Sequence, residues 1–230
     1  MFKKRTLVVL ALLTIFMYSN SQIVQKPDSI IKYEKAKYLK QDLNKFLSLK
    51  TEYPYTEMVS MKNGDVVFSF IITRNGTLES LALKDYPDAS FLNSSKTAIN
   101  SLDGEWSPTK INDSPIDMKY LIVFRFRTYI ERKPYDCKAQ ARKLFEKQKY
   151  ERALKTLNSG IEDNKYDYEL YELRSKVKEI LGDNEGAKND QLNSLRLKYE
   201  IMSIIDITSM IVRRTVKLGE SIITVPSRNQ

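Results

Sequence analysis

Hydrophobic and polar residues alternate along two runs in the first half of the chain, residues 65–73 and 77–83, and Asn75-Gly76 separates them. Alternation with a period of two indicates strands that bury one face. An Asn-Gly pair between such strands indicates a tight hairpin, in which both central residues adopt a positive φ. The first run places one set of side chains on the buried face: Val66, Phe68, Phe70 and Ile72. We therefore predict a β-hairpin here.

A helix and a third strand follow the hairpin. Apolar and small residues recur at helical spacing between Phe91 and Leu102, so we expect a helix that covers the buried face. The third strand, near residues 118–127, has five residues on one face: Met118, Tyr120, Ile122, Phe124 and Phe126. Lys119, Arg125 and Arg127 fall on the other face, which we expect to be the wetter one. So few strands leave sheet edges exposed.

The first 21 residues have the pattern of a secretory signal peptide. Lys3, Lys4 and Arg5 precede a short apolar core, and small residues stand before Gln22. The core is short for a bilayer span, which needs about 20 residues. We expect cleavage and export, with an uncleaved inner-membrane anchor as the alternative.

An amphipathic helix is predicted over residues 22–49, beginning at about Asp28. Its apolar stripe consists of Ile31, Tyr38, Leu39, Leu43, Phe46 and Leu47. We expect it to dock on a domain rather than on a membrane surface, since Glu34 and Asp42 interrupt its basic face. Tyr53-Pro54 ends it, because proline disfavours helical backbone in the preceding residue.

The second half, residues 135–200, contains an internal repeat of 34 residues. Most matched positions hold small residues: Ala141 and Ser175, Gln148 and Gly182, Ala153 and Ala187, Gly160 and Ser194. This period and pattern resemble two tetratricopeptide helix pairs. The chain departs from that family at Lys165, where proline is common, and at Arg174 and Lys178, where larger apolar residues are usual.

Two repeats need a cap, and residues 201–218 supply the candidate. Their isoleucines fit helical spacing, so we expect a capping helix. A membrane span is excluded because Asp206, Arg213 and Arg214 interrupt a run that is too short. The tail, residues 219–230, has the pattern of a short strand able to pair with a sheet edge of its own chain.

Charge and composition exclude several classes of function. The net charge of +9 falls to +6 once the three basic residues of the signal segment are removed, and the rest is spread without a basic tract. We therefore expect no nucleic-acid partner. Histidine is absent and Cys137 is the one cysteine, so Ser-His-Asp and Cys-His catalysis, His-ligated zinc and an internal disulfide are excluded. We expect no catalytic residues, no cofactor and no metal.

Several short motifs in the first half of the chain occur in the same order as in a known domain family. Tyr53-Pro54, Gly64-Asp65-Val66, Asn75-Gly76-Thr77, Trp106-Ser107-Pro108 and the segment from Pro115 through Phe126 together resemble the TonB C-terminal domain. The resemblance covers about residues 46–127. Asp113-Ser114-Pro115 stands where that family has a turn with glycine.

The resemblance implies capture of an extended peptide by strand addition, as the family does with outer-membrane transporters. The matching partner-binding positions are Tyr53, Pro54, Tyr120, Ile122, Phe124 and Arg125. For Tyr120, Phe124 and Trp106 a place in the core is the alternative. The chain lacks the proline-rich spacer of energised family members.

Together these patterns predict an α+β fold: a small TonB C-terminal-like sheet over about residues 50–130, then the tetratricopeptide-like segment. The function expected is that of an exported, periplasmic adaptor that binds envelope proteins through both modules. The alternatives are a TonB-type energy-coupling protein, if the N-terminal segment stays in the membrane, and an enzyme such as a cell-wall hydrolase. Exposed edges and tandem repeats both permit a homodimer.

Overall fold

The computed structural model describes residues 32–102, 104–131, 136–218 and 221–228. The predicted signal peptide lies outside them. The chain divides into two compact units. The sheet unit comprises Tyr33–Pro134 with Ile201–Gln230, and the helical unit comprises Met1–Lys32 with Tyr135–Glu200, of which the structure describes Lys32 and residues 136–200. The fold is mixed α and β.

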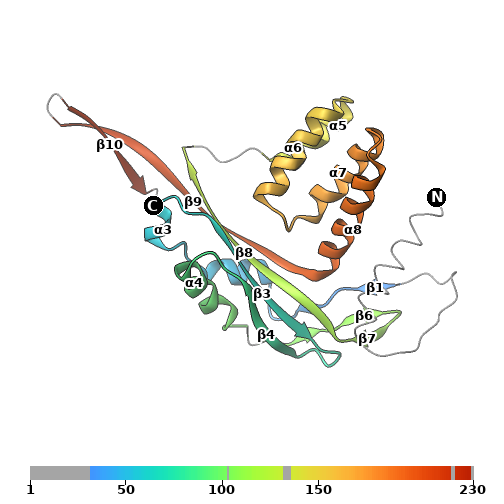
Figure 1. The fold of residues 1–230 in the computed structure, drawn as a ribbon. Coiled ribbons are helices and arrows are strands. Elements are labelled where there is room, and N and C mark those ends of the chain that lie inside the picture. The colour runs from blue at the N-terminus through green and yellow to red at the C-terminus, as the bar shows by residue number, and fades with distance from the viewer. Residues whose placement is uncertain (1–31, 103, 132–135, 219–220, 229–230) are drawn as a thin grey trace. The chain divides into compact units, whose positions relative to one another are not determined.

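A five-stranded sheet forms the sheet unit, in the order β10-β9-β8-β3-β4 (Figure 1). Its strands are β3 (Gly64–Ile72), β4 (Leu78–Asp85), β8 (Met118–Ile130), β9 (Ile201–Leu218) and β10 (Ser221–Arg228). Strand β8 pairs antiparallel with β3 and parallel with β9. The expected order of hairpin, helix and third strand is confirmed, because α4 (Ala89–Ile99) lies between β4 and β8.

The capping helix expected over residues 201–218 is wrong, because these residues form β9. Residues 201, 203, 205, 207 and 211 are buried and residues 206, 208 and 210 are exposed, which is the period of a strand. The isoleucines fit both periods, and β-branched side chains favour the strand. The tail forms the expected strand, β10, which pairs antiparallel with β9 from Ser221↔Leu218 to Arg228↔Ile211.

The predicted hairpin is present, but its turn differs from the expected one. Gly76 has a φ of 76°, whereas Asn75 is not among the residues with positive φ. The amide of Gly76 donates to the carbonyl of Thr73 (2.9 Å), and the amide of Thr73 donates to the carbonyl of Thr77 (2.9 Å). This is a three-residue loop with glycine in the left-handed position, a common alternative to the two-residue turn.

The helix expected over residues 22–49 is wrong over its described part before residue 43. Strand β1 (Tyr33–Glu34) pairs with β6 (Thr109–Ile111), which pairs with β7 (Ser114–Ile116). Strand β2 (Lys37–Tyr38) pairs with β5 (Trp106–Ser107). These tertiary pairings override the helical spacing. Only α2 (Leu43–Leu49) is helical, and it begins where the Asp42 carboxylate accepts a bond from the Lys45 amide (2.7 Å).

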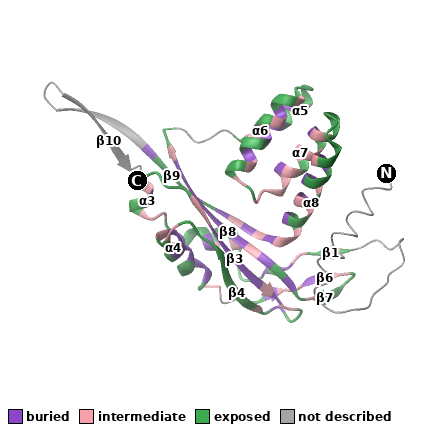
Figure 2. Ribbon diagram, viewed as in Figure 1, coloured by how far each residue is buried: buried purple, intermediate pink, exposed green. Residues whose placement is uncertain are grey.

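The core of the sheet unit lies between α4 and one face of the sheet, as expected. Phe91 of α4 stacks on Phe126 of β8 with ring centroids 4.6 Å apart. Figure 2 shows that buried residues concentrate on the central strands. The opposite face of β8 was expected to be the wetter one. Lys119 is exposed as expected, but the prediction is wrong for Arg125 and Arg127, which are only 5% and 8% exposed. Strand β8 is central in the sheet rather than at its edge.

Four helices form the described part of the helical unit: α5 (Cys137–Glu146), α6 (Tyr150–Asp163), α7 (Tyr168–Ile180) and α8 (Asn184–Glu200). The 34-residue spacing is visible in the backbone. Gln148 and Gly182 follow the first helix of each pair, and both have a positive φ (56° and 84°). The matched small residues on the second helices are buried: Ala153, Ala187, Gly160 and Ser194.

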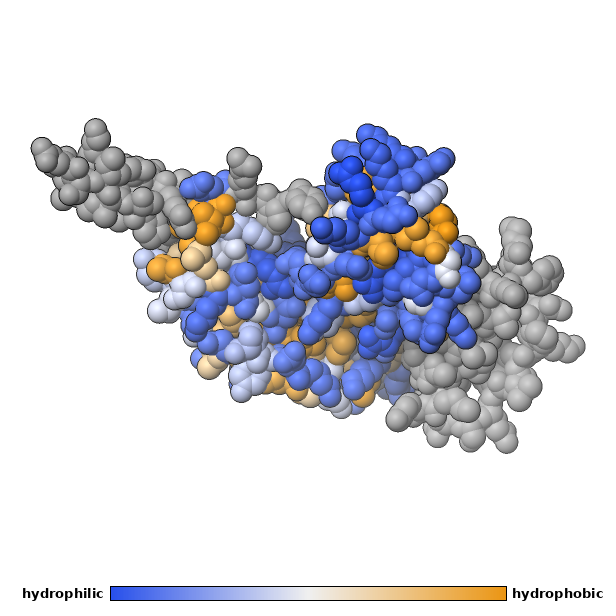
Figure 3. Space-filling model, turned by 45° about the horizontal axis from the view of Figure 1, so that its top comes forward, coloured by the Kyte–Doolittle hydropathy of each residue, from blue (hydrophilic) through white to orange (hydrophobic). Residues whose placement is uncertain are grey.

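The described residues contain neither a membrane-spanning helix nor a cluster of metal ligands. None of their helices has the length and apolar character needed to cross a membrane. They contain no group of three or more His, Cys, Asp or Glu side chains placed to hold a metal ion. The visible surface is mostly hydrophilic, with smaller hydrophobic patches (Figure 3).

Candidate partner-binding surfaces

Tyr53 and Pro54, the first two predicted contact residues, lie at the start of α3 (Tyr55–Val59). Pro54 is the N-cap of this helix, and its carbonyl accepts a bond from the Met58 amide (3.0 Å). The Tyr53 ring packs edge-on against Phe91 and Phe126, at 5.7 and 5.5 Å between centroids. Both residues therefore help to build the unit.

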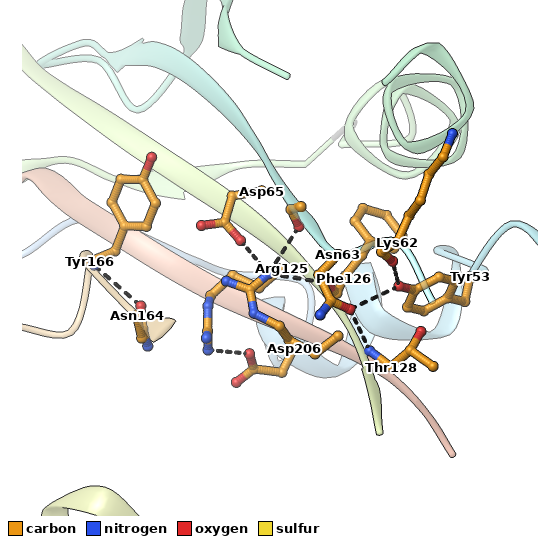
Figure 4. Close-up of polar contacts among 12 residues, drawn as sticks. Tyr53, Lys62, Asn63, Asp65, Arg125, Phe126, Thr128, Asn164, Tyr166 and Asp206 are labelled. Atoms are coloured by element: carbon orange, nitrogen blue, oxygen red, sulfur yellow. Dashed lines mark hydrogen bonds and ion pairs between the residues drawn. The ribbon is translucent and has the colours of Figure 1, made fainter. Parts of the chain in front are cut away.

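The Tyr53 hydroxyl is also held in place. It donates to the carbonyl of Lys62 and lies 3.5 Å from the Asn63 side-chain oxygen, which accepts a bond from the Thr128 amide at 2.7 Å (Figure 4). Burial raises the pKa of Tyr53. This network joins the segment before β3 to the end of β8.

Three predicted contact residues of β8 are core residues. Tyr120, Ile122 and Phe124 are each 0% exposed. The Tyr120 hydroxyl bonds to the Thr109 hydroxyl and lies 3.4 Å from that of Tyr33, so it anchors β1 and β6. A partner cannot touch these side chains without opening the fold, so we assign them a structural role. The core alternative also holds for Trp106, which is 3% exposed.

Arg125, the last predicted contact residue, belongs to a ladder of ion pairs across three strands. Its guanidinium lies 2.6 Å from the Asp206 carboxylate of β9, which stands directly opposite in the parallel register. Two residues on, the Arg127 guanidinium lies 2.7 Å from the Asp65 carboxylate of β3. Figure 4 shows Arg125 pointing toward Asp206. The ladder fixes the register of β9, because a shift by one residue would move Asp206 to the other face.

The sheet edge at which we expected strand addition is occupied. Strand β9 pairs with β8 from Leu121↔Ile201 to Ile130↔Ile211. The outermost strand on the other side is β4, which pairs with β3. Seven of its eight residues are exposed, including Leu81 (39%) and Leu83 (37%). The outer strands of the described sheet are therefore β4 on this side and β10 beyond β9 on the other.

The helical unit contains a buried ion cluster that the sequence did not reveal. The Asp190 carboxylate of α8, whose side chain is 3% exposed, accepts two bonds from the Arg174 guanidinium of α7, both 2.7 Å. The Lys178 ammonium lies 3.0 Å from the same carboxylate. The Arg174 guanidinium also donates to the Asn158 side chain of α6 (2.9 Å). Two of the three departures from the tetratricopeptide pattern, Arg174 and Lys178, thus share one counter-ion. The available signal in the sequence was Asp190, which lies between the small residues Ala187 and Ser194.

Comparison with known proteins gives no assignment. No protein-family model matches the chain, and no curated protein sequence is significantly similar to it.

Proposed function

We propose that the protein is an exported adaptor for protein–protein interaction, with a TonB C-terminal-like sheet unit and a tetratricopeptide-like helical unit. The order of elements from β3 to β8 agrees with the first resemblance. Two helical hairpins with left-handed residues 34 apart agree with the second. Linking two binding modules in one chain raises the effective concentration of one partner near the other.

The observation that carries the proposal is the outer strand β4. An outer strand offers unpaired amide and carbonyl groups, which an extended segment of a partner satisfies by adding a strand. Leu81 and Leu83 give that segment apolar side chains to contact. Register shifts in the β3–β4 pairing lie at Val67/Phe68 and Ser69/Ile71, and such irregularities restrict which strands can add. The proposed site does not include the edge of β8, because β9 occupies it.

Photo-crosslinking in the native cell envelope tests this site. A benzoylphenylalanine placed at position 81 or 83 should crosslink to an envelope protein, such as an outer-membrane transporter. The matched control is position 49, an exposed leucine of the same unit (76%) outside the sheet. The pair of substitutions Leu81→Lys and Leu83→Lys should abolish recovery of the partner, while Leu49→Lys should leave it unchanged. Equal recovery with both variants would refute the β4 site.

Export is tested separately by N-terminal sequencing of the mature protein. A chain that begins at Gln22 supports the adaptor in the periplasm. An intact Met1 would instead favour an anchored, energy-coupling protein.

A further inference from the structure

A groove runs between the two helices of the first hairpin. It has a volume of about 540 Å³ and is lined by Gln140 and Leu144 of α5 and by Arg152, Lys155 and Thr156 of α6. Leu144 is 7% exposed, so it forms an apolar floor. Arg152 and Lys155 are exposed and supply two positive charges. The groove is therefore apolar at its base and cationic at its rim.

The repeat relates this groove to the buried ion cluster of the second hairpin. Adding 34 to Gln140, Leu144 and Thr156 gives Arg174, Lys178 and Asp190. In the second hairpin the chain fills these positions with its own cation pair and carboxylate. In the first hairpin the same positions hold neutral residues, and a groove remains.

The second hairpin also shows what covers these positions. Helix α6 lies against α7, and Asn158 of α6 accepts a hydrogen bond from the Arg174 guanidinium of the cluster (2.9 Å). The corresponding side of α5–α6 is the start of the described helical array, so no helix of that array precedes it. By the repeat, the occupant that fits this face is another helix.

Charge determines the chemistry of that helix. In the second hairpin Asp190 neutralises Arg174 and Lys178, whereas the first hairpin has Thr156 in place of the carboxylate and carries its cations at other positions, Arg152 and Lys155. Among the described residues, Arg152 and Lys155 form no ion pair. Carboxylates of the occupant would pair with Arg152 and Lys155, and its apolar side chains would cover Leu144.

We propose that the α5–α6 groove, defined by the five lining residues above, binds an acidic amphipathic helix of a partner protein. The inference rests on the proposed function and names the class of partner that the helical unit takes. It concerns a site in a different unit from β4, so each can fail without the other.

The test uses the full chain and two fluorescent helical peptides of about 18 residues. One carries leucines at positions i, i+3 and i+7 flanked by glutamates, and its isomer carries lysines in place of the glutamates. The acidic peptide should bind saturably, and the lysine isomer should not. The double variant Arg152→Glu with Lys155→Glu should weaken binding by about tenfold or more. The control, Lys188→Glu with Arg196→Glu on α8, makes the same change in charge and should bind normally.

A second pair of variants distinguishes binding in the groove from general electrostatic attraction between peptide and chain. Thr156→Asp places a carboxylate where the second hairpin has Asp190, and it should weaken binding of the acidic peptide by about fivefold or more. Thr156→Asn introduces a side chain of the size of aspartate without its charge, and it should change the affinity by less than about twofold. Circular dichroism should show both variants folded.

Three results of the peptide assay would overturn the inference. They are equal binding of the two peptides, absence of saturable binding of the acidic peptide, and an affinity unchanged by Thr156→Asp. Self-association of the chain that disappears with Arg152→Glu and Lys155→Glu would identify a second copy as the occupant and would also overturn it. The crosslink from position 81 should persist in every one of these variants. Absence of that crosslink from a chain that carries only the benzoylphenylalanine at position 81 would refute the β4 site alone.

Discussion

The buried cluster around Asp190 gives a prediction whose magnitude follows from its geometry. Asp190→Ala removes the acceptor of two 2.7 Å bonds from the Arg174 guanidinium and of the 3.0 Å contact with the Lys178 ammonium. The Arg174 guanidinium then remains without a counter-ion, and the Lys178 ammonium keeps only the Asp183 carboxylate, 4.0 Å away. Breaking a buried pair from one side costs about 3–5 kcal/mol. The Arg174 and Lys178 side chains are 17% and 18% exposed, so both can reach water in part, and we expect the lower end, about 3 kcal/mol.

The first hairpin provides the matched control. Transferring its residues to the second, as Arg174→Gln, Lys178→Leu and Asp190→Thr together, removes all three charges and leaves no buried ion unpaired. Replacing a whole buried ion group by neutral residues is often neutral or stabilising. We therefore expect the triple variant to lose less than about 1 kcal/mol, although it changes more atoms than Asp190→Ala does.

Urea unfolding followed by circular dichroism measures the free energy of unfolding of each variant. Hydrogen exchange of the α7 and α8 amides then assigns the loss to this unit rather than to the sheet unit. The effect should change little with salt, because buried pairs are poorly screened. Equal destabilisation by Asp190→Ala and by the triple variant would refute the reasoning, as would a cost below about 1 kcal/mol for Asp190→Ala.

Three further predictions concern single positions. Gly76→Ala should destabilise the sheet unit by at least about 2 kcal/mol in thermal unfolding, because the added Cβ would lie 2.2 Å from the Trp106 carbonyl oxygen at a φ of 76°. The comparison is Gly182→Ala, where φ is 84° but the space around the Cβ is open. This substitution should cost about half as much. Gly160→Leu should cost about 1–3 kcal/mol, because even a Cβ there meets the Cys137 Cβ at 3.1 Å, whereas the exposed neighbour variant Ser159→Leu should be tolerated. Burial lowers the pKa of Lys35 to about 8, so between pH 8 and pH 10.5 the unfolded chain binds more protons than the folded chain. The free energy of unfolding should therefore rise with pH over that range in the wild type but not in Lys35→Met. Parallel curves of unfolding free energy against pH for the two chains would contradict this.

The local elements were predictable where one period dominated the sequence. The β3–β4 hairpin, α4 and β8 followed from alternation and helical spacing within short segments. The segment before α2 was mispredicted because its pairing partners, β5 and β6, lie some 70 residues further along the chain. Strand β9 was mispredicted because an isoleucine-rich run satisfies both periods, and only its register beside β8 decides between them. The predicted partner-binding residues of β8 were mispredicted because of a distant pairing as well. Tyr120 and Phe124 alternate as expected, but a partner strand on each side makes β8 a central strand.

Strand β9 brings the chain back to the sheet unit after the helical unit. Parallel strands cannot be joined by a tight turn and need a long crossover connection. Between β8, which ends at Ile130, and β9, which begins at Ile201, the crossover contains the helical hairpins, and α8 ends at Glu200, the residue before β9. The helical unit is therefore an insertion within the sheet unit rather than a domain that follows it. The edge of β8 is completed by a strand of the same chain, held by the Arg125–Asp206 pair and by isoleucines that are buried on one face. A peptide directed to that edge would compete with a covalently attached strand at high effective concentration, and for this reason the proposed site for strand addition is β4 rather than β8.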